Sequence, residues 1–321
     1  MAFSLPDHWV WDFWLADDGA TYHLFYLHAP RALGNPDLRH RNARIGHATS
    51  IDLVNWQNHG QILDTGAAGS FDDTASWTGS VVRGPDGQWR LYYTGSRFLS
   101  PSSNANVETV GMAVSDDLYS WRKLPGPVCI ADPQLYETLG NSDWPEEAWR
   151  DPWVFADAAG QWHMLVTARA NHGALMERGV IGHAVSNDMQ SWQVQPALSA
   201  INGGFSHLEV PQIVAVDGTL HLLFCCDSPR LSGRLTGQKG GVWSVAIPSE
   251  LGPYPIERAT LLVPEELYAG RIATDRSGRA VLLAFNNVQS GGDFAGSISD
   301  PLPVKIGRHA DGLPRLELEA R

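Results

Sequence analysis

The sequence predicts an all-β protein, a five-bladed β-propeller with four antiparallel strands per blade and no appended β-sandwich. Three observations favour this fold. A hairpin signal recurs five times, a Gly-to-Trp segment recurs at a period of about sixty residues, and no stretch has the pattern of a long amphipathic helix. Repeats of this length are typical of propeller blades, whereas a parallel β-solenoid, the rival architecture, has much shorter repeats. We therefore expect residues 1–321 to form a single domain.

The first two strands of each blade are predicted from a tight turn between two β-rich runs. Asp-Gly and related pairs supply the positive φ angles that such turns need. The five turns and the runs after them are Asp18-Gly19 before 22–26, Asp86-Gly87 before 89–93, Gly160 before 162–166, Asp217-Gly218 before 220–224, and Ser277-Gly278 before 280–285. Each turn is expected to join the innermost strand of a blade to the second one.

The third strand is predicted to end in a repeated Ser-x-Asp sequence, and the fourth follows it. Three copies start at Gly46, Gly111 and Gly182 and reach Trp56, Trp121 and Trp192 ten residues later, and weaker copies occur at 241–245 and 295–300. Residues that recur in every unit serve what every unit shares. We therefore expect these Trp side chains to pack in the blade cores, Asp52, Asp117 and Asp188 to bind local backbone, and His47 and His183 to be structural.

The heads of the first strands, in contrast, differ between blades. Asp12, Asp151 and Glu209 stand at the heads of blades one, three and four, each beside an apolar run. Desolvating an ionised carboxylate costs several kcal/mol or raises its pKa. First strands line the central channel of a propeller, so the three carboxyls should converge. Taken singly, Asp151 could be a turn residue paired with Arg150, and Glu209 an ion-pair partner. Together they predict an active site, because paired carboxyls are the usual equipment for glycoside cleavage.

The composition limits the classes of molecule that the protein is expected to bind. Lys plus Arg number 23 against 35 Asp plus Glu, and a net charge of -12 argues against nucleic acid or an anionic membrane as a partner. The 13 Trp residues suit sugar rings as well as cores. We expect a small sugar or oligosaccharide partner, and the sequence does not predict the oligomeric state.

The cysteines and the first residues bear on cofactors and location. Cys129, Cys225 and Cys226 form neither a disulfide framework nor a zinc spacing, so no metal and no cofactor are predicted. Residues 1–8 lack the basic start and apolar stretch of a signal peptide, and no run of about 18 apolar residues occurs. A cytoplasmic protein is therefore expected.

Several of these segments resemble motifs of glycoside hydrolase families 32 and 68, five-bladed propellers that act on β-fructofuranosides such as sucrose, levan and inulin. Val10-Trp11-Asp12-Phe13-Trp14 is similar to the nucleophile motif of levansucrases, and Trp77-Thr78-Gly79-Ser80 to their Trp-Ser-Gly-Ser segment. Arg150-Asp151-Pro152 resembles the Arg-Asp-Pro motif of both families, and residues 22–26 and 46–50 resemble family 32 invertases. The resemblance covers nearly the whole chain.

The resemblance implies a retaining glycosidase that forms a covalent fructosyl-enzyme intermediate and performs hydrolysis, fructosyl transfer or both. Asp12 would be the nucleophile and stay ionised, Glu209 the acid/base, and Asp151 the transition-state stabiliser, oriented by Arg150. The substrate-binding residues would be Trp11, Trp77, Ser80, Arg150, His207 and Arg271.

Two departures from these families leave the leaving group open. Phe13-Trp14 follows Asp12 where invertases have Pro-Asn-Gly, and Val210 follows Glu209 where Cys or Arg is usual. Loops at 31–44, 98–108 and 230–239 are expected to rim the channel mouth and decide this specificity. Two other hypotheses stay open. One is an arabinofuranosidase- or xylosidase-like enzyme of a related propeller, and the other is a sugar-binding propeller without catalysis.

Overall fold

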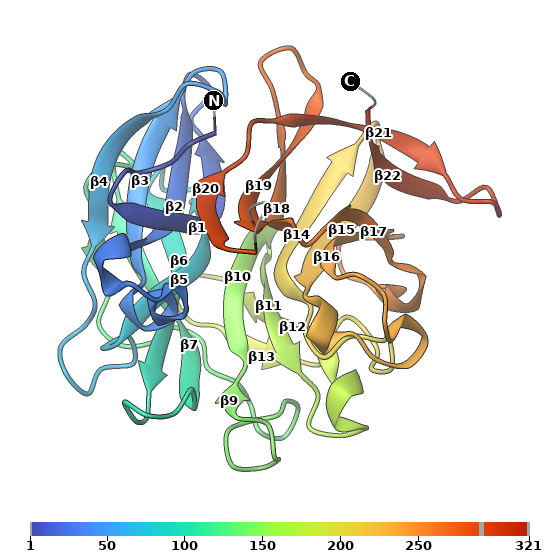
Figure 1. The fold of residues 1–321 in the computed structure, drawn as a ribbon, viewed down its shortest axis with the longest axis horizontal. Coiled ribbons are helices and arrows are strands. Elements are labelled where there is room, and N and C mark those ends of the chain that lie inside the picture. Colours follow the sequence, from blue (N-terminus) through green and yellow to red (C-terminus); the bar gives the residue numbers. More distant parts are fainter. Residues whose placement is uncertain (1, 289–291, 320–321) are drawn as a thin grey trace.

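Five antiparallel sheets are arranged around a central channel in the computed structural model, which describes residues 2–288 and 292–319 (Figure 1). The innermost strand of each sheet contacts the innermost strand of the next, and the fifth contacts the first, which closes the ring. The prediction of a five-bladed all-β propeller is thereby confirmed. In the part of the chain that the structure describes, helices are short 3₁₀ segments such as η2 (Pro36–Asn42), and none is long and apolar enough to cross a membrane.

The strands follow one another outward in each blade. Blade I holds β1 (His8–Asp17), β2 (Tyr22–Pro30), β3 (Arg44–Ser50) and β4 (Gln57–Leu63), and blade II holds β5 (Ala75–Arg83), β6 (Trp89–Phe98), β7 (Asn106–Ser115) and β8 (Arg122–Lys123). Blade III holds β10 (Trp149–Ala156), β11 (Trp162–Arg169), β12 (Gly179–Ser186) and β13 (Gln193–Gln195), and blade IV holds β14 (Glu209–Val216), β15 (Thr219–Cys226), β16 (Gly241–Ala246) and β17 (Thr260–Pro264). Blade V holds β18 (Leu267–Thr274), β19 (Ala280–Val288), β20 (Phe294–Ile298), β21 (Leu302–Arg308) and β22 (Pro314–Leu318).

Two features depart from a plain four-stranded repeat. In blade V the third-strand position is divided between β20 and β21, which both pair with β19. Pro301 lies in the break, and proline has no N–H with which to continue a ladder. In blade II a two-residue strand, β9 (Glu146–Glu147), pairs in parallel with β7. This strand brings the loop before blade III to the channel mouth.

The repeated residues have the structural roles that the sequence predicted. The Asp188 carboxylate accepts the backbone N–H groups of Gln190 and Ser191 at 2.8 and 2.7 Å. Equivalent turns form at Asp52 and Asp117. His47 and His183 pair with the imidazoles of His23 and His163 at 2.9 and 3.0 Å. Trp56, Trp121 and Trp192 are half-buried and pack against the apolar clusters of the blades.

Every innermost strand carries a β-bulge near its head. The pairing register shifts between Val10 and Phe13, Trp77 and Gly79, Arg150 and Trp153, Glu209 and Gln212, and Tyr268 and Arg271. A bulge re-aims the side chains on either side of it. The residues that precede it, namely Val10, Trp77, Arg150, Glu209 and Tyr268, therefore occupy equivalent places in the five blades.

This register distinguishes two of the predicted acids. Glu209 and Asp151 do not occupy equivalent places, because Glu209 precedes its bulge, as Arg150 does, whereas Asp151 lies within its bulge, as Val210 does. Asp151 and Val210 have φ values of 58° and 54°. Both acids lie nine residues before a turn glycine, but the hairpin of blade III has the longer turn. The same distance to the turn glycine therefore corresponds to different places in the two strands.

Candidate active site

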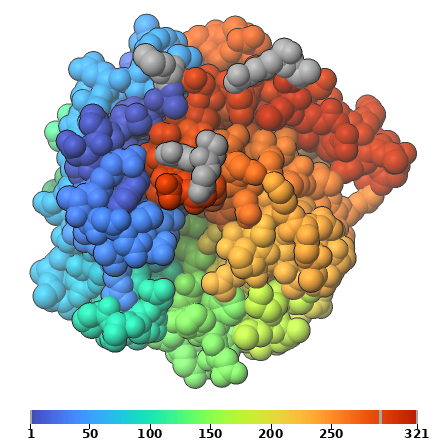
Figure 2. Space-filling view, viewed as in Figure 1, coloured from blue at the N-terminus to red at the C-terminus, as the bar shows by residue number. Residues whose placement is uncertain are grey.

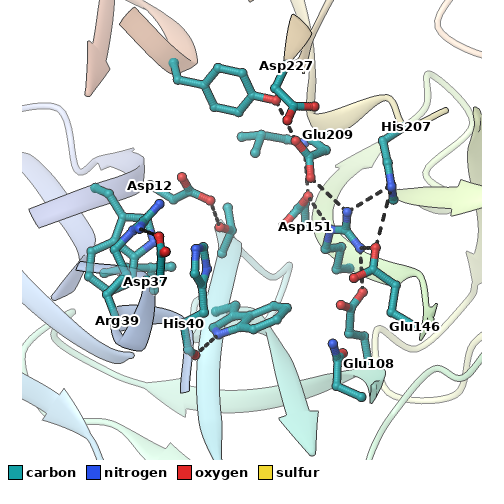
Figure 3. A pocket seen from close by; sticks show the side chains of 18 of the residues that line it. Asp12, Asp37, Arg39, His40, Glu108, Glu146, Asp151, His207, Glu209 and Asp227 are labelled. Atoms are coloured by element: carbon teal, nitrogen blue, oxygen red, sulfur yellow. Dashed lines mark hydrogen bonds and ion pairs between the residues drawn. The ribbon is translucent and has the colours of Figure 1, made fainter. Parts of the chain in front are cut away.

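A cavity of about 560 Å³ lies where the five innermost strands begin (Figure 3). All five blades contribute to its wall through residues at or beside the bulges, which are Trp11, Asp12, Trp77, Thr78, Arg150, Asp151, Glu209, Val210 and Tyr268. The three predicted acids Asp12, Asp151 and Glu209 point into the same space. A deep polar pocket of this kind suits a small ligand rich in hydroxyl groups.

Asp12 has a neutral hydrogen-bond donor. Its Oδ2 accepts the hydroxyl of Thr78 at 2.6 Å. Burial, followed by the neighbouring charge of Asp151, raises the pKa of Asp12 to about 7. This result departs from the expectation that Asp12 stays ionised, because a carboxyl with this pKa is about half-protonated at neutral pH.

Glu209 has two strong donors. Its Oε1 accepts Arg150 Nη2 at 2.8 Å, and its Oε2 accepts the phenol of Tyr268 at 2.6 Å. Arg150, Glu209 and Tyr268 occupy the same pre-bulge place in three successive blades, so the register itself brings them into contact. Glu209 therefore lies between a cation and a phenol, and its environment differs sharply from that of Asp12.

Asp151 is fixed from several sides. Its Oδ2 accepts the hydroxyl of Thr167 at 2.8 Å and the backbone N–H of Val210 at 3.1 Å. Its own N–H donates to Thr94 Oγ1 at 2.9 Å, which supports the left-handed backbone. Burial raises the pKa of Asp151 above its ordinary value, although Arg150 opposes that shift. The carboxyl is held rigidly, as a group that receives substrate hydroxyls should be.

Arg150 contacts most of the carboxylates of the site. Its Nη1 lies 2.8 Å from Glu108 Oε2 and 3.3 Å from Glu146 Oε1, and its Nε lies 3.7 Å from Asp151 Oδ2. The expectation that it orients Asp151 is therefore only part of its role, since its shorter contacts are to Glu108 and Glu209.

The ring of His207 completes this side of the pocket. Arg150 Nη2 can only donate, so His207 Nδ1, 3.0 Å away, accepts. Burial and the nearby Arg150 hold the pKa of His207 well below its ordinary value, so the ring is neutral. Nε2 then carries the proton and faces Glu146 Oε1 at 3.5 Å.

The predicted substrate-binding residues divide into two groups. Trp11, Trp77, Arg150 and His207 line the pocket, whereas Ser80 and Arg271 do not. The Ser80 hydroxyl accepts the N–H of Val154, and Arg271 donates to the carbonyls of Val210 and Pro211. Both residues follow their bulges and are buried in the channel wall. In blade V, Tyr268 takes the place at the pocket that the sequence assigned to Arg271.

Other pocket residues were not predicted individually, although most of them lie in the predicted rim loops. Two of the three predicted rim loops line the mouth extensively, whereas only Arg230 does so from the third. Arg39 and Arg41 lie over the rings of Phe294 and Phe98 at 4.1 and 4.2 Å. The further polar lining consists of Asp37, His40, Asn104, Asn106, Glu108, Glu146, Asp227 and Asn287. Glu108 and Glu146 could have been suspected only by aligning third strands and loops, since neither heads a blade.

Comparisons with known proteins agree with this architecture. A family model described as the glycosyl hydrolases family 32 N-terminal domain matches residues 14–291. A fructan 6-exohydrolase of Beta vulgaris is 27% identical over 204 residues, which are 59% of this chain and 29% of that protein. A raffinose invertase of Escherichia coli is 24% identical over 279 residues, 83% of this chain and 52% of that one. The chain thus spans about half or less of the length of these curated relatives.

Solved structures share the fold. The inulosucrase from Halalkalicoccus jeotgali, solved bound to kestose, has a TM-score of 0.79 at 22% identity and covers 98% of this chain and 87% of its own. The levansucrase of Bacillus subtilis has a TM-score of 0.74 at 17% identity, covering 99% and 88%. At these identities the likeness establishes the propeller architecture only, and the chemistry has to be inferred from the residues of the pocket.

Proposed function

Because this chain belongs to the glycosyl hydrolases of family 32, we propose that it is a retaining enzyme that cleaves β-fructofuranosides such as sucrose or fructo-oligosaccharides. One observation carries the proposal. Two carboxyls with different environments, Asp12 and Glu209, share one pocket with a third, rigidly held carboxyl. The family match begins two residues after Asp12, so the role of Asp12 rests on this geometry and on the resemblance of its motif.

The first half-reaction forms a covalent intermediate. An Asp12 carboxylate oxygen attacks the anomeric carbon of the fructosyl unit, and the bond from that carbon to the leaving oxygen breaks. Glu209 gives its proton to the leaving oxygen, so the departing sugar leaves as a neutral alcohol. Tyr268 and Arg150 hold the Glu209 carboxyl in place for this transfer. Asp151 accepts hydrogen bonds from ring hydroxyls as positive charge develops.

The second half-reaction releases the fructosyl unit. Glu209, now ionised, takes a proton from an incoming water or sugar hydroxyl, whose oxygen attacks the anomeric carbon and displaces Asp12. Water gives hydrolysis, and a sugar hydroxyl gives transfer. The configuration is retained because two displacements occur at the same carbon. The choice between the two acceptors belongs to the mouth of the pocket, where Arg39, Arg41 and Arg230 lie.

The relatives support the fructosidase hypothesis over the pentofuranosidase one. Both curated relatives compared above are named as enzymes of fructans or of a fructose-containing oligosaccharide. A cytoplasmic location remains a proposal. It is supported by three buried cysteines that are all free, as is usual in a reducing compartment, and cell fractionation would check it.

Substrate assays with two active-site variants test the function. The wild-type protein should cleave sucrose or a fructan and leave chromogenic arabinofuranosides intact. Glu209→Ala should lower kcat on sucrose by about 10³-fold or more, and azide, as an external nucleophile, should partly rescue the turnover of an activated fructoside by this variant. With Asp12→Ala, no fructosyl adduct should be trapped on the protein in mass spectra. Unchanged turnover by Glu209→Ala, or an adduct on another residue, would overturn these assignments.

A further inference from the structure

We propose that Glu108 is a positioning residue of the active site: its carboxyl holds the Arg150 guanidinium in the orientation that reaches Glu209 and Asp151. The inference rests on the proposed function, in which Glu209 must present its proton to the leaving oxygen. Glu108 heads no blade and lies on β7, the third strand of blade II. It acts across the boundary between blades II and III.

The surroundings of the Glu108 side chain point to a single role, which is to bind Arg150. Its side chain is fully buried. Among the residues that the structure describes, its one hydrogen-bond donor is Arg150 Nη1, at 2.8 Å from Oε2, and Oε1 has no partner. Burying a carboxyl with half of its hydrogen-bonding capacity unused is costly. Among the described residues, no other hydrogen bond of this side chain offsets that cost, so Glu108 acts on the site through Arg150.

Arg150 requires such an anchor because its guanidinium is a rigid plane with a fixed fork of donors. The Nη1 corner is held from blade II by Glu108, and the Nη2 corner reaches blade IV at Glu209, 2.8 Å away. Fixing one corner fixes the direction of the other. Without Glu108 the guanidinium can rotate toward Asp151, which already lies 3.7 Å from Nε. Glu209 would then lose the donor that orients its Oε1.

Glu146 cannot replace this anchor. It also contacts Nη1, but at 3.3 Å, and its side chain is 21% exposed against 0% for Glu108. It lies on the two-residue strand β9 and faces Trp144 and His207 as well. Figure 3 shows Glu146 and Glu108 on the same side of the pocket, away from Asp12. Glu146 therefore divides its contacts among several residues, whereas the Glu108 carboxyl binds Arg150.

The anchor needs an acceptor oxygen rather than a charge. Burial raises the pKa of Glu108 to about 8, although Arg150 opposes the shift, so the carboxyl is largely neutral at pH 7. A neutral carbonyl oxygen still accepts from Nη1. Glutamine, with a carbonyl oxygen at the same distance along the chain, should therefore serve almost as well as glutamate.

Three variants and two substrates test the proposal. Sucrose needs a proton on its leaving oxygen, whereas fructosyl fluoride needs far less help from the acid. Glu108→Ala should lower kcat on sucrose by about 100-fold but on fructosyl fluoride by less than about tenfold, because general acid catalysis is worth 10²–10⁴. Glu108→Gln should stay within about threefold of the wild type on both. Thr109→Val, at a neighbouring residue of β7 outside the pocket lining, should match the wild type.

Equal losses on both substrates in a folded Glu108→Ala protein would overturn the proposal, as would a Glu108→Gln variant no better than Glu108→Ala. A crystal structure of Glu108→Ala gives a readout without activity. Arg150 should have turned away from Glu209, and a guanidinium still 2.8 Å from Glu209 Oε1 would also overturn the proposal. A wild-type protein inactive on both substrates would refute the proposed function instead, and the crystal structure would still decide the role of Glu108.

Discussion

At the scale of single residues, the two carboxyls proposed as nucleophile and acid/base are distinguished by their donors. Asp12 accepts one neutral hydroxyl, whereas Glu209 accepts a guanidinium and a phenol. An attacking carboxylate must be free to approach carbon, and strong donors would lower its nucleophilicity. A proton donor must instead be held in one orientation. The two environments fit these roles in orientation, whereas the raised pKa of Asp12 and the cation beside Glu209 do not follow from them, so the assignment of roles rests on the motif resemblance as well.

The pH dependence of the reaction should follow Asp12. The Thr78 hydroxyl stabilises the ionised form of Asp12, whose pKa is about 7 because burial dominates. Thr78→Val removes that stabilisation, so the pKa should rise and the acid limb of kcat/KM should move to higher pH, by about one unit. Below the limb the variant should lose activity, and well above it activity should recover. The measurement is the pH profile of kcat/KM on sucrose.

Ser76→Ala is the matched control for Thr78→Val. Ser76 lies on the same strand, is fully buried and is absent from the pocket lining, and its hydroxyl has no hydrogen-bond partner among the described residues. Its profile should coincide with that of the wild type. If Thr78→Val left the acid limb in place, a group other than Asp12 would control it.

The sequence identified some site residues and missed others for a physical reason. The three acids were recognisable because they break a repeat and because burial makes such positions costly. The sequence assigned the blade V place in the pocket to Arg271 rather than to Tyr268. The bulge between these two residues shifts the strand register, and a bulge cannot be located from strand patterns alone. Glu108 falls in the predicted rim loop 98–108, but its individual role was missed, because that role depends on a contact with Arg150 formed only in three dimensions.

At the scale of elements, turns and strands were the most predictable part of the molecule. Hairpin glycines and Ser-x-Asp turns act through local hydrogen bonds, and local chemistry is visible in sequence. The division of the third strand in blade V and the short strand β9 depend on neighbouring segments instead. The β-bulges also depend on neighbouring segments, and they position the residues of the candidate site.

The Ser-x-Asp turn should contribute measurable stability. Backbone N–H groups of Ser191 and Gln190 lower the pKa of Asp188 to about 2. A folded-state pKa below the unfolded value stabilises the fold above pH 4, and this contribution is lost as the pH falls from about 4 toward 2. Asp188→Ala should therefore lower the free energy of unfolding by about 1 kcal/mol at pH 7. Urea denaturation at pH 7 and pH 3 should show the difference narrowing.

The exposed neighbour Asn187 provides the comparison, since Asn187→Ala should be neutral at both pH values. A destabilisation of Asp188→Ala that stayed constant between pH 7 and pH 3 would mean that the carboxylate contributes through packing rather than through its charge-assisted hydrogen bonds.

At the scale of the whole molecule, the active site exists only because the ring closes. Each blade supplies pocket residues from its innermost strand, and none has a complete site. At the junction of blades I and V, β20 lies against β1, and Figure 2 shows residues of blade I (blue) beside residues of blade V (red). Tyr22 donates to the carbonyl of Thr274 at 2.9 Å, and Arg276 pairs with Asp17 at 2.6 Å across that junction. Closure thus fixes Asp12 relative to the four other blades.

Phe3 should be a main contributor to this closure. Its carbonyl accepts the N–H of Ile298 in β20 at 2.8 Å, and its ring packs on Tyr26 and Trp56 of blade I. Since Phe3 is only 7% exposed, Phe3→Ala should cost about 3 kcal/mol and lower Tm by several degrees. Leu313→Ala, at a side chain 40% exposed, should leave Tm unchanged. In hydrogen exchange, protection should fall in both β1 and β20, because both lie at the junction. Exchange that rose only in blade I would show that Phe3 stabilises its own blade and that other contacts close the ring.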